Sequence, residues 1–273
     1  SAYAVGLQSD GKIIVAGGAT VNGQSQVALA RYTSAGVLDV TFGTGGTTLT
    51  PFGQSATAFG LAIDSLNRIV VVGTSDSSLL IMRYGAAGIL DGTFGSGGIT
   101  TDEIGSQNTS FSIVLDSLER PLVCGPIDDV AFLGRYTTSG TLDGAFGTGG
   151  ITQAAAGAFS VFYDLTVQTN GDIVTAGFAD DLNVITGRFD STGAPDGSFG
   201  NGGISSVLFS TTSALRAVHI NSSGDVLVAG FCCSDVLFMK LDAQGDLDTN
   251  FSLDGILLDP QGSPCGMLVG PTG

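Results

Sequence analysis

One motif recurs five times along the chain at a nearly constant spacing. It reads LDxxF, with proline in place of leucine once, and its aspartates follow one another at intervals of 52, 52, 53 and 52 residues: Asp39, Asp91, Asp143, Asp196 and Asp248. A fixed period of this length indicates repeated supersecondary units, each too small to bury its own apolar face. Features found in every repeat therefore serve the architecture first, and function is to be sought where the repeats differ.

Each repeat contains four short apolar runs separated by turn residues. In the second repeat they cover residues 47–52, 58–63, 69–73 and 78–84, with Gly, Asn, Asp and Ser between them. Runs rich in Val, Ile and Leu at even spacing, with no sustained helical period, predict strands. Four strands in about 50 residues are typical of a β-propeller blade. The sequence therefore predicts an all-β, five-bladed propeller with four antiparallel strands per blade.

The repeat phase predicts how 273 residues divide into one propeller domain. Four blades are expected at 47–98, 99–150, 151–203 and 204–255, and the first blade at 1–46 lacks its first strand. Residues 256–260 have the phase of that strand, so we expect them to complete the N-terminal blade and leave no open sheet edge. The tail at 261–273 either lies outside the ring or marks a chain cut from a longer one.

The composition excludes some partners. The net charge is −16, from 25 acidic and nine basic residues. Such a surface repels phosphate backbones and argues against nucleic acid and anionic membranes. No apolar run approaches the roughly 20 residues needed to cross a bilayer. The charge suits solubility in an extracellular or salty setting, and it leaves open a cationic partner or divalent ions.

A basic residue stands eight positions before every LDxxF aspartate: Arg31, Arg83, Arg135, Arg188 and Lys240. The strict pairing predicts structural ion pairs that tie the fourth strand of each repeat to the turn after it, because the arginine fork binds a carboxylate through two donors. The alternative is a ring of five aspartates around a cation. The phenylalanine of the motif is expected to fill the gap between neighbouring blades.

The segments at 8–17 (QSDGKIIVAG) and 28–43 (ALARYTSAGVLDVTFG), with the glycine pair that follows, resemble the delta-60 repeat family of bacterial propeller proteins. The resemblance extends over essentially the whole chain, and it weakens in the fourth and fifth repeats, where Pro195, Lys240, Leu241 and Ser252 depart from the pattern. It implies a propeller on a secreted or envelope-associated protein. It brings no catalytic residues.

The loops between the first and second strands and those between the third and fourth are expected to share one face, and they vary most between repeats. The loop at 17–26 is the longest, and several loops carry acids. Loops that a scaffold leaves free are where binding chemistry collects. The candidate ligand-binding residues are Asn22, Gln24, Asp128, Asp129, Asp180, Asp181, Asp235 and, on a strand, Arg216. No cofactor is predicted. A Ca²⁺-binding rim remains an alternative, although no EF-hand-like spacing supports it.

Arg216 interrupts a position that the other repeats fill with aromatic residues: Tyr3, Phe59, Phe111 and Tyr163. His219, the single histidine, follows three residues later and is expected on the other strand face. No nucleophile accompanies either residue. This is the sharpest asymmetry that the sequence contains.

The first strand of each predicted blade is expected to line a polar central channel, through Thr48, Thr50, Asp102, Glu103, Gln153, Ser205, Ser206 and Asp259. Asp102 and Glu103 are neighbours and point to opposite strand faces, so they cannot act as a pair. A channel carboxylate pair for glycoside hydrolysis remains the enzymatic alternative.

Four cysteines complete the inventory. Cys124 replaces a strand valine and is expected to be a buried thiol. A disulfide from Cys265 to Cys232 or Cys233 would fix the tail.

These features favour a non-enzymatic binding or adhesion module of an exported bacterial protein, extracellular or in the cell envelope. Its expected partner is a surface glycan or protein, and it is expected to form part of a longer chain. A carbohydrate-active enzyme and a structural spacer are the alternatives.

Overall fold

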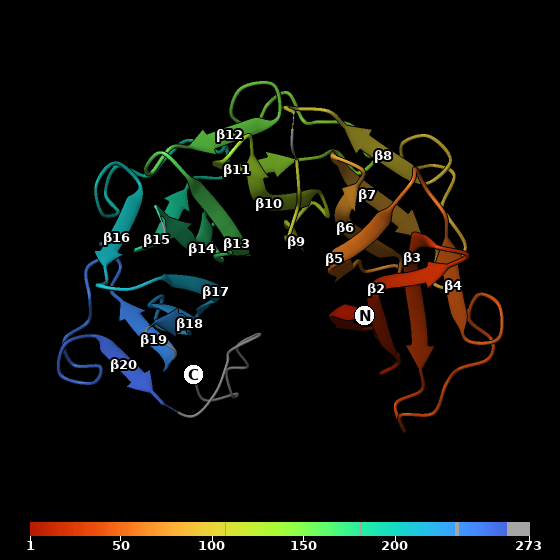
Figure 1. The fold of residues 1–273 in the computed structure, drawn as a ribbon, viewed down its shortest axis with the longest axis horizontal. Coiled ribbons are helices and arrows are strands. Elements are labelled where there is room, and N and C mark those ends of the chain that lie inside the picture. Colours follow the sequence, from red (N-terminus) through yellow and green to blue (C-terminus); the bar gives the residue numbers. More distant parts are fainter. Residues whose placement is uncertain (107, 181, 233–234, 261–273) are drawn as a thin grey trace. The chain divides into compact units, whose positions relative to one another are not determined.

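The computed structural model describes residues 1–260 except Gln107, Asp181, Cys233 and Ser234. These residues form strands and turns, with 20 strands in five antiparallel sheets of four (Figure 1). In this described part of the chain, no helix is long and apolar enough to span a membrane. Five consecutive four-stranded antiparallel sheets are the strand topology of a five-bladed β-propeller, as the sequence predicted.

The sheets follow one another along the chain. The first contains β1 (Ala2–Leu7), β2 (Ile13–Val21), β3 (Gln24–Tyr32) and β4 (Thr47–Thr50). The second contains β5 (Ala56–Ile63), β6 (Ile69–Ser75), β7 (Ser78–Tyr84) and β8 (Ile99–Asp102). The third contains β9 (Ser112–Leu115), β10 (Pro121–Ile127), β11 (Val130–Arg135) and β12 (Ile151–Ala154). The fourth contains β13 (Ser160–Val167), β14 (Ile173–Ala179), β15 (Asn183–Phe189) and β16 (Ile204–Leu208). The fifth contains β17 (Ser213–Ile220), β18 (Val226–Cys232), β19 (Asp235–Leu241) and β20 (Ile256–Asp259).

The boundaries between sheets differ from those that the repeat phase predicted. Residues 47–50 form the last strand of the first sheet, paired with β3, and do not begin the second sheet. The same holds for β8, β12, β16 and β20, each of which pairs with the strand before it in sequence. The reason is the turn after LDxxF, which reverses the chain onto the same sheet, so that Arg31 N donates to Gly46 O at 3.1 Å.

The predicted closing strand pairs elsewhere for the same reason. β20 lies beside β19, with Met239 opposite Ile256, and the first sheet has four strands of its own. The assignment of residues 256–260 to the N-terminal blade is therefore wrong. A fifth strand would have to join a sheet that is already complete.

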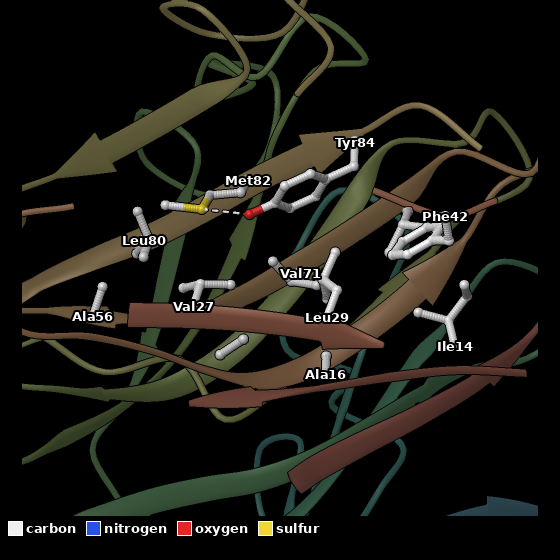
Figure 2. Close-up of a cluster of buried hydrophobic side chains, with 12 residues drawn as sticks. Ile14, Ala16, Val27, Leu29, Phe42, Ala56, Val71, Leu80, Met82 and Tyr84 are labelled. Atoms are coloured by element: carbon white, nitrogen blue, oxygen red, sulfur yellow. Dashed lines mark hydrogen bonds between the residues drawn. The ribbon is translucent and has the colours of Figure 1, made fainter. Parts of the chain in front are cut away.

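The chain divides into two compact units, which we describe separately. The first comprises residues 1–123 with 134–143, and the second comprises residues 124–133 with the chain from 144 onward. In the first unit, the core between the first two sheets contains Phe42 of the LDxxF motif, packed among Ile14, Leu29, Val71 and Tyr84 (Figure 2). Phe42 is fully buried, as are its counterparts Phe94, Phe146 and Phe199. The motif phenylalanine of these four repeats is therefore core material.

Tyr84 adds a polar contact to this core. Its hydroxyl donates to Thr50 Oγ1 at 2.7 Å. The same hydroxyl lies 3.1 Å from the sulfur of Met82 (Figure 2). Burial raises the pKa of Tyr84 to about 12, so the neutral phenol is the form present at neutral pH. The hydrogen bond joins β7 of the second sheet to β4 of the first.

The second unit has a core of the same kind between its fourth and fifth sheets. Phe199 packs there with Val174, Leu215, Val228 and Leu237, all of them buried. Because the same strand positions supply the core in both units, the repeat period of the sequence is also the period of the packing.

Candidate ligand-binding site

The strictly repeated basic and acidic residues form ion pairs inside the scaffold. The base eight positions before each LDxxF aspartate lies within 2.9 Å of it in all five repeats. The fork of Arg31 also donates to the carbonyl of Ala86 at 2.7 Å and to the hydroxyl of Thr41 at 3.0 Å. One arginine thus ties a strand, its following turn and the next repeat together, which explains the fixed spacing.

Local hydrogen bonds hold these aspartates in the charged form. The hydroxyl and the amide of Thr41 donate to Asp39 and, with the charge of Arg31, lower the pKa of Asp39 to about 2. The pKa of Asp91 is lowered first by the hydroxyl of Thr93, and that of Asp248 first by Lys240. Carboxylates satisfied in this way are scaffold and have no need of a metal ion.

A second base joins the pair in the first three repeats, and the sequence analysis missed it. Arg120, in the turn before β10, lies 2.7 Å from Asp116 and 3.1 Å from Asp143. Lys12 and Arg68 occupy the same turn position and reach Asp39 and Asp91 at 3.6 and 3.8 Å. The signal was a basic residue in three of the five equivalent turns.

The hairpin loops at the other end of each sheet hold most of the candidate ligand-binding residues, and turn geometry accounts for several of them. Asn22, Asp128, Asp129 and Asp180 all have positive φ, between 47° and 68°. Asparagine and aspartate tolerate this left-handed conformation better than most residues. Their side-chain type is therefore what the turns require, whatever else they bind.

The carboxylates of two hairpin aspartates brace neighbouring loops. Asp76 accepts hydrogen bonds from the amides of Gln54 and Ser55 at 3.1 Å, and Asp180 accepts one from the amide of Phe159 at 3.0 Å. Of the remaining candidates, Gln24 is exposed at the start of β3 and Asp235 is half-buried at the start of β19. Asp181 lies outside the described residues.

The proposed disulfide cannot be traced, because Cys233 and Cys265 lie outside the described residues. Cys232 and Cys124 are fully buried. The placement of Cys124 in β10 agrees with the expectation of a buried thiol.

The strands that were expected to line a channel lie at the wrong edge of their sheets. Within the first unit β5 packs against β1 and β9, and within the second β17 packs against β13, so neighbouring sheets approach through their first strands. The expected channel residues lie on or directly after β4, β8, β12, β16 and β20, the last strands. Asp102 and Glu103 therefore lie away from that approach. Burial, followed by the charge of Asp102, raises the pKa of the buried Tyr136 well above its usual value.

The first strands share a β-bulge that turns one side chain out of each ladder. In four sheets the pairing register shifts at a single residue, which is Tyr3, Phe59, Tyr163 or Arg216. A glycine faces each bulge on the second strand. A Cβ on Gly230 would lie 1.9 Å from the carbonyl oxygen of Ala214, so no other residue fits there.

The bulge side chains pack against other aromatic rings of their unit. In the first unit the ring centroids of Tyr3 and Phe59 are 5.2 Å apart, and those of Phe59 and Phe111 are 5.8 Å apart. In the second unit the ring of Tyr163 stacks on Phe178 at 5.8 Å with an interplanar angle of 17°. Such distances are typical of favourable aromatic pairs.

Arg216 takes the bulge position of the fifth sheet and lies among these rings. Its guanidinium carbon is 3.6 Å from the ring centroid of Tyr163 and 5.7 Å from that of Phe231. Both distances are within the range of cation–π attraction. The aromatic faces hold the guanidinium without using its N–H donors.

No acidic residue neutralises this arginine within the described ranges. The other eight lysines and arginines all make salt bridges with aspartates, whereas Arg216 makes neither a salt bridge nor a side-chain hydrogen bond to any described residue. Its guanidinium carries five N–H donors, and the residue as a whole is half-buried. We therefore take Arg216, Tyr163, Phe178 and Phe231 as the candidate ligand-binding site and call them the Arg216 cluster.

Within the described part of the chain, neither the histidine nor a cluster of metal ligands adds to this site. The side chain of His219 makes no hydrogen bond or ion pair with any residue that the structure describes. Over the same residues, no group of three or more His, Cys, Asp or Glu side chains is placed to hold a metal ion.

Comparisons with known proteins support the fold class. Residues 8–42 match the family described as a domain of unknown function (DUF5122) β-propeller. No curated protein sequence is significantly similar to the chain. The sequence match covers the first repeat, where the family resemblance was also strongest.

Solved structures extend the fold similarity over most of the chain. Virginiamycin B lyase from Staphylococcus aureus has a TM-score of 0.57 at 13% identity, over 90% of this chain and 68% of the lyase. A protein from Lactobacillus plantarum gives 0.59 at 14% identity, over 90% and 69%. A protein of unknown function from Bacteroides caccae gives 0.55 at 13% identity, over 97% and 85%. At such identities the similarity concerns the fold alone.

Proposed function

We propose that this chain is a non-catalytic binding module of an exported bacterial protein of the delta-60 repeat type, and that it recognises a surface glycan or protein that carries an acidic group. The observation that carries the proposal is Arg216, a half-buried arginine whose guanidinium has aromatic faces around it and no carboxylate partner among the described residues.

The charge balance makes this arginine informative. With 25 acidic residues against nine basic ones, an arginine in this chain has many possible carboxylate partners. Eight of the nine bases use them, as described above. An arginine held by rings, with its donors left over, suits a carboxylate or sulfate that arrives on a ligand, because planar oxyanions fit the guanidinium fork.

The surrounding rings suit the rest of such a ligand. Tyr163, Phe178 and Phe231 are half-buried, so each retains some surface to contact an apolar ring face or an aliphatic chain. The β18–β19 hairpin lies at the same end of the fifth sheet as the loop before β17. Asp235 at this end would repel a second acidic group and so restrict which acids bind.

The experiment compares the wild-type chain with Arg216→Tyr on a glycan array that contains sialylated, uronic-acid, sulfated and neutral glycans. Tyrosine is what two other repeats carry at this position, so the variant restores the repeat and removes only the cation. We expect acidic glycans to bind the wild-type chain and to show no binding to the variant. Equal binding by both proteins would remove Arg216 from recognition. Binding of no array member would favour a protein ligand or the structural spacer, and turnover of a bound glycan would show an enzyme.

A further inference from the structure

A cleft of about 330 Å³ opens in the second unit at the outer strands of the third and fourth sheets. Its walls come from the end of β12 and the residues after it, and from β16 with the turn before it (β12 and β16 in Figure 1). This site is separate from the Arg216 cluster, which belongs to the first strands β13 and β17 and to β14 and β18. Its volume falls within the range of small-molecule pockets.

The cleft exists because the third and fourth repeats depart from the others at this junction. Ala156 follows β12 at a position where Phe52 follows β4 and Phe209 follows β16. Both phenylalanines pack onto the core between their sheets. An alanine at this position leaves the volume of an aromatic ring unfilled.

A second departure removes a hydrogen bond that closes another junction. In the first unit the hydroxyl of Tyr84 donates to Thr50 at 2.7 Å. At the cleft, Phe189 replaces the tyrosine and Ala154 replaces the threonine, so both partners of that bond are missing. Phe189 is fully buried and lies beneath the floor of the cleft.

A third departure reduces the volume of a side chain that lines the cleft next to Phe189. Pro195 stands where the other four LDxxF motifs have leucine, and it bridges to Phe189 as Leu90 bridges to Tyr84. Truncating several core residues at one place normally costs stability, because the lost contacts are not replaced. A ligand that fills the cleft would restore such contacts.

The polar side chains at the cleft are all uncharged. Gln153, Asn201 and Ser206 line it and are exposed, and no Asp, Glu, Lys, Arg or His is among the lining residues. Amide and hydroxyl side chains both donate and accept hydrogen bonds. In a chain with a net charge of −16, an uncharged lining favours a neutral ligand.

We propose that this cleft binds a neutral sugar residue, alone or at the end of a glycan. Sugar hydroxyls donate and accept hydrogen bonds and so match the three rim side chains, while the C–H face of a pyranose suits the accessible alanine and proline surface between them. The cleft thus adds a second binding site, for a neutral ligand, to a scaffold that has an arginine site elsewhere.

The test uses saturation-transfer NMR on the full chain with three probes: methyl glucopyranoside, methyl galactopyranoside and N-acetylglucosamine. We expect saturation of at least one probe by wild type. Its signal should disappear in Ala154→Thr/Ala156→Phe, which returns the residues of the first repeat to the cleft. The filled variant should melt at the wild-type temperature or above it.

Two further variants keep the outcome decisive if the filled chain does not fold. Gln153→Leu introduces, at an exposed position on the rim, the leucine that the first repeat has as Leu49. It should weaken binding of the sugar probe at least tenfold without affecting folding. Arg216→Tyr should leave the probe signal unchanged, whatever it does to acidic glycans. The proposal is overturned if no probe is saturated by wild type, if the signal survives filling of the cleft or Gln153→Leu, or if Arg216→Tyr abolishes it.

Discussion

The guanidinium of Arg216 lies 3.6 Å from the ring centre of Tyr163, its counterpart in the preceding repeat. Each residue lies at a β-bulge in the first strand of its sheet. The same backbone irregularity therefore presents an aromatic ring in the fourth sheet and a cation in the fifth. The pair shows how a repeated scaffold gains a site through one substitution. Packing and backbone are kept, and the chemistry of one half-buried position changes.

Arg216→Tyr should therefore alter binding and leave folding alone. A half-buried side chain with no ion pair among the described residues contributes little to stability, and we expect a change in unfolding free energy of less than about 0.5 kcal/mol. Binding of an acidic ligand to wild type should weaken as salt rises, because the contact is electrostatic. Urea titration and binding at two ionic strengths measure both. Salt-independent binding would contradict the role given to the cation.

Arg83→Met should have the opposite profile. Arg83 is buried and pairs with Asp91 at 2.9 Å, so removing it leaves that half-buried carboxylate without the base of its pair. We expect a loss of about 3 kcal/mol, at the lower end for broken buried pairs, because Arg68 remains 3.8 Å away. Arg216→Met is the matched control and should cost far less in the same denaturant titration. Equal losses would mean that the ion pair is not the source of the effect.

The same aspartates predict how stability depends on acid. The pKa values of Asp39, Asp91, Asp196 and Asp248 all lie below the ordinary value, with that of Asp39 at about 2. A carboxylate whose pKa is lower in the folded state stabilises the fold above its unfolded pKa, near 3.9, and loses that contribution as pH falls through the folded value. The melting temperature should therefore stay level from pH 7 to about 5 and fall steeply between about 4 and 2.

Asp91→Asn provides the control for this pH dependence. The variant should be less stable than wild type at pH 7, because the amide cannot replace the charge opposite Arg83. Its melting temperature should change less between pH 5 and 2, because one of the titrating carboxylates is gone. A curve parallel to that of wild type over this range would show that Asp91 does not contribute to acid unfolding.

Periodicity made the scaffold predictable from sequence, and local asymmetry made the sites harder to predict. The eight-residue spacing of Arg31 and Asp39 was enough to predict an ion pair, because both lie on one short strand-and-turn segment. The sheet boundaries could not be read in the same way. A repeat can be cut at any phase, and only the pairing of β4 with β3 shows where the sheet ends.

The candidate site could be predicted in part from the sequence. Arg216 stood out against the aromatic residues of the other repeats, but that it has no carboxylate partner among the described residues depends on distances that the sequence does not contain. The cleft was missed altogether. Its signal lay in Ala154, Ala156, Phe189 and Pro195, four small departures separated by up to about 40 residues, which share a surface only after the sheets pack. The sequence pointed instead to the acidic hairpins as ligand-binding loops, although the positive φ of Asp128 and Asp180 explains why aspartate occurs at these turns.

The bulges themselves can be tested through the glycines that face them. Gly73 lies opposite the bulge at Phe59, and a Cβ there would approach the carbonyl oxygen of Thr57 to 1.9 Å. Because a backbone atom cannot yield as a flexible side chain can, Gly73→Ala should cost about 2–3 kcal/mol.

Gly92→Ala is the matched control for Gly73→Ala, since Gly92 is exposed and a Cβ there would meet nothing within 4 Å. We expect it to change the unfolding free energy by less than about 0.5 kcal/mol in the same urea titration. Gly230→Ala repeats the test at the bulge of Arg216, and for this variant ligand binding is measured together with stability. If Gly230→Ala folds with wild-type stability and wild-type affinity for acidic glycans, then the fifth sheet has no bulge at Arg216, and the geometry that turns this arginine out of the ladder is wrong.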